Sequence, residues 1–203
     1  ASMLKKLPTV KHLELANHNL SDLSPLRRAT ALESLDITQN AITDLTALAQ
    51  LPNLQRLYAA RNKLTSLPSP NTWSKLIELN VAANEISDIS ALMTMTSLES
   101  VDFSRNKVQS LAPLSNLGVL RIIFAEENKI RDVSGLATAQ NLEQLHIARN
   151  SVSDLRPLVD LPGLRYVKYL DLRENPINRS GCPIVGESQA VITFCQNTFV
   201  DRN

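Results

Sequence analysis

The side chains that most often carry catalysis or bind metals are few in this chain, and their placement argues against both uses. Only two cysteines are present, Cys182 and Cys195, near the C-terminal end of the 203 residues. The three histidines, His12, His18 and His146, all precede them, so no cysteine–histidine pair for nucleophilic catalysis is indicated. No glycine-rich phosphate loop, CxxC pair or histidine–glutamate zinc motif occurs. We therefore expect no catalytic residues, no cofactor and no metal.

Asparagine is the polar residue with the most regular placement. An amide offers two donors and one acceptor oxygen, which suits hydrogen bonds to backbone groups of its own and neighbouring turns. We therefore predict a structural ladder without a direct functional role. Six of its members follow one another at 22-residue steps and a seventh follows after 25 residues: Asn40, Asn62, Asn84, Asn106, Asn128, Asn150 and Asn175. His18 occupies the position one step before the first of them.

Apolar residues keep the same period around each asparagine. The window from Leu32 to Ile42 fits the pattern L-x-x-L-x-L-x-x-N-x-L, and the windows Leu98–Val108 and Leu142–Val152 repeat it. The alternation of apolar and polar residues inside each window favours a short strand with one buried face. One such strand cannot bury a core alone, so the repeats should stack into a parallel sheet with the leucines inside.

A second polar position lies four residues after each asparagine position. Aspartate and serine there suit a helix N-cap or a tight turn, and prolines three residues later suit a first helical turn. A ladder of metal-binding carboxylates is the alternative, but local capping explains each residue separately. We expect short 3₁₀ or α turns on this side of the repeats. The position is filled by Asp22, Asp44, Ser66, Asp88, Ser110, Asp132 and Asp154.

These windows resemble the leucine-rich repeat family in its 22-residue class, to which bacterial internalins and a regulatory subunit of protein phosphatase-1 belong. The resemblance covers Leu4 to Ile177. It implies an α/β fold, a curved, right-handed leucine-rich repeat solenoid with a parallel β-sheet on its concave face and short 3₁₀ or α turns and loops on its convex face. We expect one elongated domain, with a partial repeat and eight strand units over residues 1–177 and a C-terminal cap over residues 178–203.

The end of the chain resembles the cap of exported bacterial leucine-rich repeat proteins, in which an Asn-Pro motif precedes Cys-Pro and a second cysteine. Asn175-Pro176 and Cys182-Pro183 follow that order. The resemblance implies a Cys182–Cys195 disulfide, with Ala190–Phe194 forming a terminal strand or helical turn over the last repeat. Two reduced, buried cysteines are the alternative. The resemblance also implies a secreted, periplasmic or cell-envelope protein, with a cytoplasmic location as the alternative.

Two further irregularities interrupt the repeat. The chain opens in the middle of a unit, so we expect a cap and a signal peptide upstream of Ala1. Later, Leu67-Pro68-Ser69-Pro70 replaces the usual helical turn. Two prolines within three residues predict an extended segment, and we expect Trp73 to fill the resulting gap in the core.

Function should reside on strand residues that point away from the core, on the concave face. Exposed aromatic residues beside arginine are typical of binding hot spots, although single apolar residues on a surface are also normal. Arg61, Arg105 and Arg149 recur every 44 residues, and pairing with Glu127 and Glu174 on the same face is the favoured alternative to partner binding. The predicted partner-binding residues are Tyr58, Phe124, Tyr169, Arg56, Arg61, Ile122, His146 and Asp102.

Charge narrows the class of partner. The forty solvent-facing sheet positions hold eight basic and eleven acidic residues, and the whole chain carries a net charge of +1, which disfavours nucleic acid and anionic membranes. No stretch is apolar for long enough to span a membrane. We expect a non-catalytic protein–protein interaction module, a monomer that binds a protein or peptide. The alternative is the substrate-recognition region of a larger enzyme or signalling protein, and an intracellular phosphatase regulator is less favoured.

Overall fold

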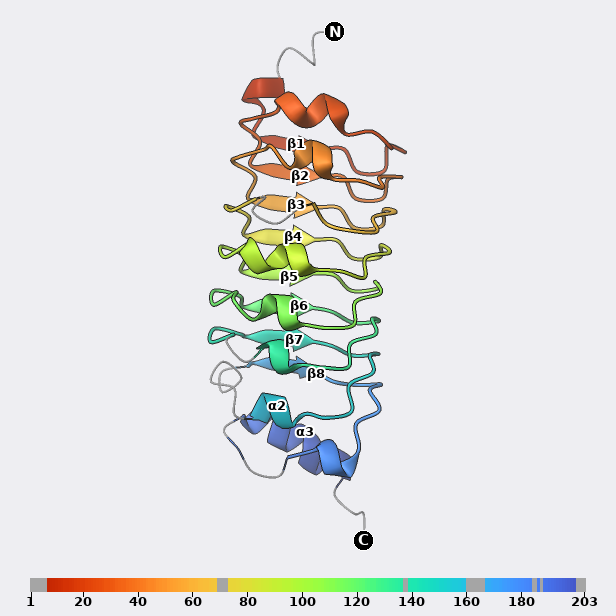
Figure 1. Ribbon diagram of the computed structural model, residues 1–203, viewed down its shortest axis with the longest axis vertical. Coiled ribbons are helices and arrows are strands. Elements are labelled where there is room, and N and C mark those ends of the chain that lie inside the picture. The colour runs from red at the N-terminus through yellow and green to blue at the C-terminus, as the bar shows by residue number, and fades with distance from the viewer. Residues whose placement is uncertain are drawn as a thin grey trace.

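The chain folds into one parallel sheet whose strands follow each other in sequence order. The computed structural model describes residues 7–68, 73–136, 139–159, 167–183, 186 and 188–199. Each strand pairs in parallel with the strand of the next repeat, so that Leu35, for example, lies opposite Leu13 and Leu57 (Figure 1). The strands are β1 (His12–Glu14), β2 (Ser34–Asp36), β3 (Arg56–Tyr58), β4 (Glu78–Asn80), β5 (Ser100–Asp102), β6 (Ile122–Phe124), β7 (Gln144–His146) and β8 (Tyr169–Asp171).

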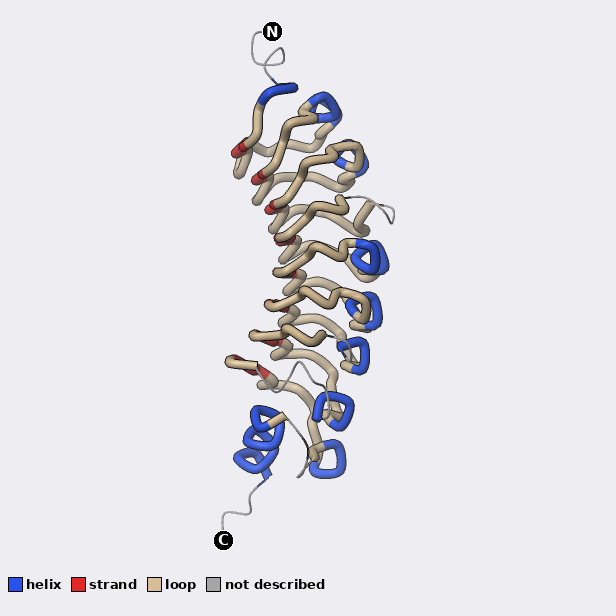
Figure 2. Tube along the Cα trace, turned by 90° about the vertical axis from the view of Figure 1, so that its left-hand side faces the viewer, coloured by secondary structure: helices blue, strands red, loops and turns tan. Residues whose placement is uncertain are grey.

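Short helices line the side opposite the sheet. Figure 2 shows the strands along one side of the molecule, which is shallowly concave, and most of the helices along the other, whereas the last helix lies at the C-terminal end beneath the last strand. This arrangement is the predicted α/β solenoid. The helices are η1 (Leu7–Thr9), η2 (Ser24–Arg28), η3 (Thr46–Leu48), η4 (Ser90–Thr94), η5 (Ala112–Leu114), η6 (Ser134–Leu136) and η8 (Arg179–Gly181), all 3₁₀, and the α-helices α2 (Arg156–Val159) and α3 (Gln189–Phe199).

The aspartates that precede these helices form tight turns. In five repeats an aspartate Oδ1 accepts a hydrogen bond from the N–H two residues later at 2.7–2.9 Å, as Asp22 does from Ser24. The residue at the N-cap position of η2 is Leu23, whose side chain makes no capping bond. Of the two roles expected for these residues, the structure therefore shows the tight turn.

Between the sheet and the helices lies a continuous apolar core. The leucine positions of the central repeats are almost completely buried, whereas those of the first and last repeats, such as Leu13 and Leu170, are partly buried. Phe103 is the largest side chain with no exposed surface. Trp73 is buried as predicted, and its indole N–H donates to the Leu48 carbonyl at 2.9 Å. Its polar atom is thereby satisfied while its rings fill the core. The extended segment expected around Ser69 and Pro70 lies outside the described residues.

The asparagine ladder ties each repeat to the one before it. Asn106 Nδ2 donates to the carbonyls of Val81 and Phe103 at 3.0 Å, and its Oδ1 accepts from the Ile86 N–H at 2.9 Å. The same donors and acceptors recur from Asn40 to Asn175. These bonds satisfy backbone groups at the strand ends that would otherwise be buried without partners.

The residue before each asparagine position turns the chain out of the strand. Eight such residues adopt left-handed backbone conformations, with φ between 53° and 59°, although none of them is glycine. In the first seven, the N–H group donates to a carbonyl of the next repeat, as Gln39 does to Ala60 at 2.8 Å. This turn ends every strand after the same number of residues and so keeps the side chains of the sheet face in columns. The eight are Asn17, Gln39, Arg61, Ala83, Arg105, Glu127, Arg149 and Glu174.

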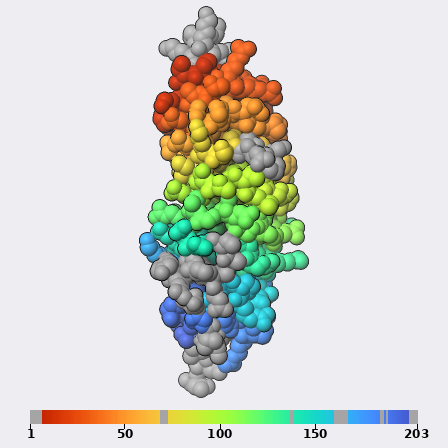
Figure 3. All heavy atoms as spheres, turned by 60° about the vertical axis from the view of Figure 1, so that its left-hand side comes forward, coloured from red at the N-terminus to blue at the C-terminus, as the bar shows by residue number. Residues whose placement is uncertain are grey.

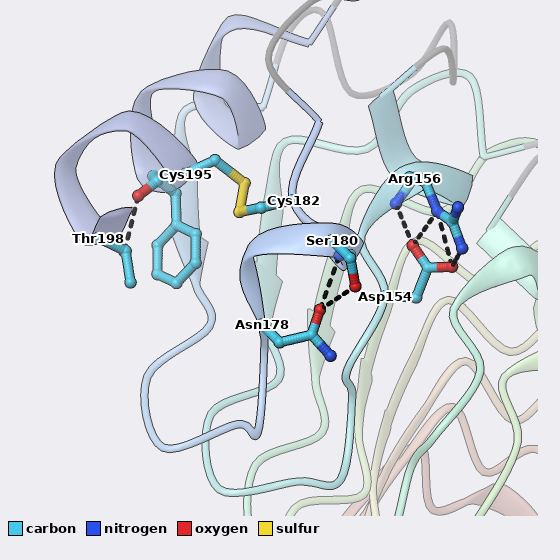
Figure 4. Close-up of a disulfide and its surroundings, with 9 residues drawn as sticks. Asp154, Arg156, Asn178, Ser180, Cys182, Cys195 and Thr198 are labelled. Carbon is cyan, nitrogen blue, oxygen red and sulfur yellow. Dashed lines mark hydrogen bonds and ion pairs between the residues drawn. A yellow bond between two sulfur atoms is a disulfide. The ribbon is translucent and has the colours of Figure 1, made fainter. Parts of the chain in front are cut away.

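The last repeat is covered by a helix held by a disulfide. Cys182 and Cys195 are bonded, with their Cα atoms 5.6 Å apart, and Figure 4 shows the bond joining the segment after η8 to α3. The segment Ala190–Phe194, expected as a strand or a helical turn, belongs to this helix, and its Val191 is completely buried. Figure 3 shows the repeats as successive bands down the molecule.

Some predictions concern residues outside the described ranges. The opening half-repeat before Leu7 is one of them. The division of the chain into repeats up to Ile177 and a cap from Asn178 stays a prediction.

Candidate binding face on the concave sheet

Three rings stack across the C-terminal strands of the concave sheet. The Phe124 and His146 ring centroids are 4.4 Å apart with a tilt of 37°, and the His146 and Tyr169 centroids are 4.5 Å apart and nearly parallel. The repeat explains this contact, because Phe124 and His146 are paired in register on β6 and β7. Tyr169 comes from a neighbouring column on β8 and leans over His146. Its 48% exposure makes it the most exposed large apolar side chain on the sheet.

Carboxylates lie against this aromatic stack. Glu126 Oε1 is 3.4 Å from His146 Nδ1, and Glu126 Oε2 accepts a hydrogen bond from the Ser104 hydroxyl at 2.6 Å. Asp102 accepts from the Ser104 N–H at 2.9 Å and is paired in register with Phe124. Ser104 therefore connects two acidic side chains that flank the first ring of the stack.

Asp102 and Asp171 occupy equivalent strand positions but differ in electrostatics. Burial raises the pKa of Asp102, and the nearby Glu126 carboxylate adds to this effect. The pKa of Asp171 is lowered, mainly because Arg173 donates hydrogen bonds to its carboxylate at 2.7–2.9 Å. Asp171 thus has a guanidinium partner, whereas Asp102 lies in an environment that disfavours its charged form.

A chain of ion pairs runs along the asparagine edge of the same strands. Glu127 accepts from Arg105 and Arg149, and Arg149 reaches Glu174 at 2.9 Å. Pairing within the face, the favoured interpretation of Arg105 and Arg149, is what the structure contains. Arg61, the third member of that series, has no ion pair among the described residues.

A shallow depression of about 410 Å³ opens between the stack and this chain of ion pairs. Phe124, Asp102 and Glu126 line it, and Asp171 and Arg173 contribute from the last repeat. The depression therefore combines an aromatic surface with several carboxylates.

A separate group of predicted residues lies on β3. Tyr58 donates its hydroxyl to Glu78 at 2.8 Å, and burial together with this bond raises its pKa. Arg56 lies on the same strand, and Arg61 follows it. Three strand spacings, about 14 Å, separate β3 from β6, so this group does not touch the aromatic stack.

The predicted residues are therefore divided between two places. The structure brings together Phe124, His146 and Tyr169, with Asp102 on one side and Ile122 on the same strand as Phe124. The expectation that Tyr58, Phe124 and Ile122 are exposed is only partly right, since all three are half-buried by neighbouring side chains. Sequence reasoning missed Glu126 and Ser104, which lie in the same column of the repeat two residues beyond the strand. That spacing was the signal that could have found them.

A metal site and a membrane-spanning helix have requirements that the described residues do not meet. Within the described ranges, no three histidine, cysteine or acidic side chains gather into a group that could hold a metal ion. The helices described are likewise all too short or too polar to cross a membrane.

Comparison with known proteins agrees with the geometry. Residues 52–92 match a family model described as leucine-rich repeats in two copies, and residues 29–48 match a second leucine-rich repeat model. Searching the curated proteins gives no match.

Several solved structures are similar to this chain in sequence and fold. An internalin (InlF) from Listeria monocytogenes is 31% identical with a TM-score of 0.81, and the match covers 89% of this chain and 53% of that one. Internalin C2 from the same organism is 28% identical with a TM-score of 0.58, covering 82% and 84%. A plant peptide hormone receptor, RGFR1, in complex with RGF2, is 26% identical with a TM-score of 0.64, covering 76% and 26%. The chain spans about half the length of the InlF chain.

Eight parallel strands joined through 3₁₀ turns, an asparagine ladder and these matches define a leucine-rich repeat solenoid. Within that class the chain is an internalin-like leucine-rich repeat protein.

Proposed function

We propose that this chain is a non-catalytic module that binds a protein or peptide on its concave sheet, centred on the Phe124–His146–Tyr169 stack. The observation that carries the proposal is that stack, since three contacting rings ending in an exposed Tyr169 form an aromatic surface bordered by charged groups. Such a centre with a polar rim is the composition of binding hot spots. Leucine-rich repeat neighbours that include a receptor in complex with a second molecule support a protein-interaction module.

The location we propose is secreted or in the cell envelope of a bacterium. The Cys182–Cys195 disulfide supports it, because disulfides persist in oxidising compartments. The similarity to Listeria internalins points in the same direction. We propose that the module acts as a monomer, without a nucleic-acid partner.

The test compares the aromatic stack with two exposed apolar residues outside the sheet. Immobilised wild type, a Phe124→Ala/Tyr169→Ala variant and a Met93→Ala/Val119→Ala variant are used to capture proteins from host and envelope extracts, with quantification by mass spectrometry. Met93 and Val119 are 45% and 43% exposed but lie outside the sheet, which makes them a matched control. We expect a captured protein that the first variant loses by at least about tenfold and the control retains. Equal capture of every protein by all three forms would overturn the proposal.

A further inference from the structure

Asp102 and Glu126 hold charges that the ion pairs of the sheet face do not neutralise. The arginines around the depression are already engaged, Arg105 and Arg149 by glutamates of the asparagine edge and Arg173 by its own aspartate. Among the described residues, neither Asp102 nor Glu126 has a lysine or arginine partner. His146 is the one basic side chain paired with Glu126 within the described ranges.

The scaffold does not require this charge at Asp102. Asn80 occupies the equivalent position on β4, and its Oδ1 accepts the same backbone hydrogen bond, from Ala82 at 3.0 Å. Asp36 on β2 makes that bond as well, from Thr38 at 2.8 Å. An amide would therefore end β5 equally well and would avoid the unfavourable burial of a carboxylate. A charge kept at a cost to stability is typical of a functional position.

An aromatic surface lies directly beside these two carboxylates. Phe124 is paired with Asp102 in register on one side and contacts His146 on the other. On its β5 side no second ring contacts it among the described residues. Asp102, Phe124 and Glu126 all line the depression of about 410 Å³, which extends across β6 and β7 to residues of the last repeat.

A guanidinium group matches this combination. It is planar, remains charged, stacks on aromatic rings and directs several N–H donors toward carboxylates. We infer that the depression formed by Asp102, Phe124 and Glu126 is a subsite for an arginine side chain of the partner protein. The inference deepens the proposed function, because it assumes that the partner docks on this part of the concave sheet and specifies which chemistry it presents there.

The experiment uses small probes and the ¹⁵N spectrum of the intact chain. N-acetyl-arginine amide is titrated into the protein and compared with N-acetyl-citrulline amide, which has nearly the same shape but no charge, and with N-acetyl-lysine amide. We expect saturable shifts at the amides of residues 102–104 and 124–126, with the arginine probe binding at least about tenfold more tightly than the citrulline probe. Equal binding of arginine and citrulline would overturn the inference, as would preference for the lysine probe.

Variants locate the subsite. Asp102→Asn and Glu126→Gln should each abolish the arginine-dependent shifts, whereas Asp36→Asn, which changes the equivalent acid on β2, should leave them unchanged. The spectra themselves report whether each variant is folded. If Asp102→Asn does not fold, the Glu126→Gln variant alone tests the subsite. Arginine shifts that persist in both variants, or that vanish equally in Asp36→Asn, would refute the assignment.

The two proposals can fail separately. If capture from extracts depends on Tyr169 but the arginine probe does not bind, the binding face stands and the arginine subsite is wrong. If the probe binds at Asp102 and Glu126 but capture does not depend on Phe124 and Tyr169, the depression binds a guanidinium group but the proposed docking face is wrong.

Discussion

The two halves of the concave sheet have the same scaffold and different surfaces. The twenty solvent-facing positions of the β1–β4 half include seven charged residues, and Lys11–Glu33 is the ion pair formed there among the described residues. The corresponding positions of the β5–β8 half include twelve charged residues, most of them joined in ion pairs around an aromatic stack. Because the same asparagine hydrogen bonds recur in both halves, surface residues can change without altering the fold.

Removing the disulfide tests whether the cap stabilises the C-terminal half selectively. A Cys182→Ser/Cys195→Ser variant should lose ~2–4 kcal/mol of stability, because the closed loop no longer restricts the unfolded chain. Hydrogen exchange should accelerate in β7, β8 and α3 while β1–β3 stay protected. Exchange that rises equally in all eight strands would show that the cap stabilises the whole stack.

Asparagine substitutions test whether the scaffold is uniform. Asn106→Ala in the C-terminal half and Asn62→Ala in the N-terminal half remove the same kind of hydrogen bonds, so each should cost on the order of 1–3 kcal/mol. Urea unfolding followed by circular dichroism measures both. A large difference between the two losses of stability would mean that the halves differ in scaffold as well as in surface. A urea unfolding curve unchanged in either variant would contradict the stabilising role of the asparagine ladder.

Asp102 and Asp171 should respond to substitution in opposite directions. Burial raises the folded-state pKa of Asp102, so its charged form destabilises the fold above that pKa, and the penalty disappears as the pH falls below the unfolded value. Asp102→Asn should therefore melt roughly 1–3 °C higher at pH 7, with the difference vanishing in acid.

The pKa of Asp171 is lowered by Arg173, so its stabilisation is present above the unfolded pKa and is lost as the pH falls through the folded one. Asp171→Asn should melt lower at pH 7 and approach wild type in acid. Melting curves between pH 3 and pH 8 check both variants, with Asp36→Asn as the reference from the N-terminal half. Shifts of the same sign for Asp102→Asn and Asp171→Asn would contradict the contrast.

The smallest effect is expected from the ion pairs themselves. Glu127→Gln breaks the pairs with Arg105 and Arg149, and Glu33→Gln breaks the pair with Lys11 in the other half. Exposed pairs contribute little to stability, so both variants should melt within about 1 °C of wild type. If Glu127→Gln proved as destabilising as Asn106→Ala, the chain of ion pairs would have to be counted as scaffold.

Sequence reasoning was most accurate where the repeat alone decides the outcome. The positions of the strands, the buried leucines, the hydrogen bonds of Asn106 and the burial of Trp73 all follow from spacing, because each unit meets the same neighbours in the same geometry. The candidate site was less predictable. Tyr58 has its hydroxyl bonded to Glu78, and Phe124 is half-buried beneath its neighbours, which no single unit of the sequence reveals.

The sequence by itself determined a stack of parallel strands, its columns of outward-facing residues and the class of protein, since a 22-residue period leaves the chain one way to bury its leucines. The tertiary structure decided which of those residues meet. Tyr169 reaches His146 from another column, Arg149 reaches two glutamates, and Asp102 has no lysine or arginine partner within the part of the chain that the structure describes. These contacts depend on side-chain directions across neighbouring strands, and the period fixes only the backbone from which the side chains start.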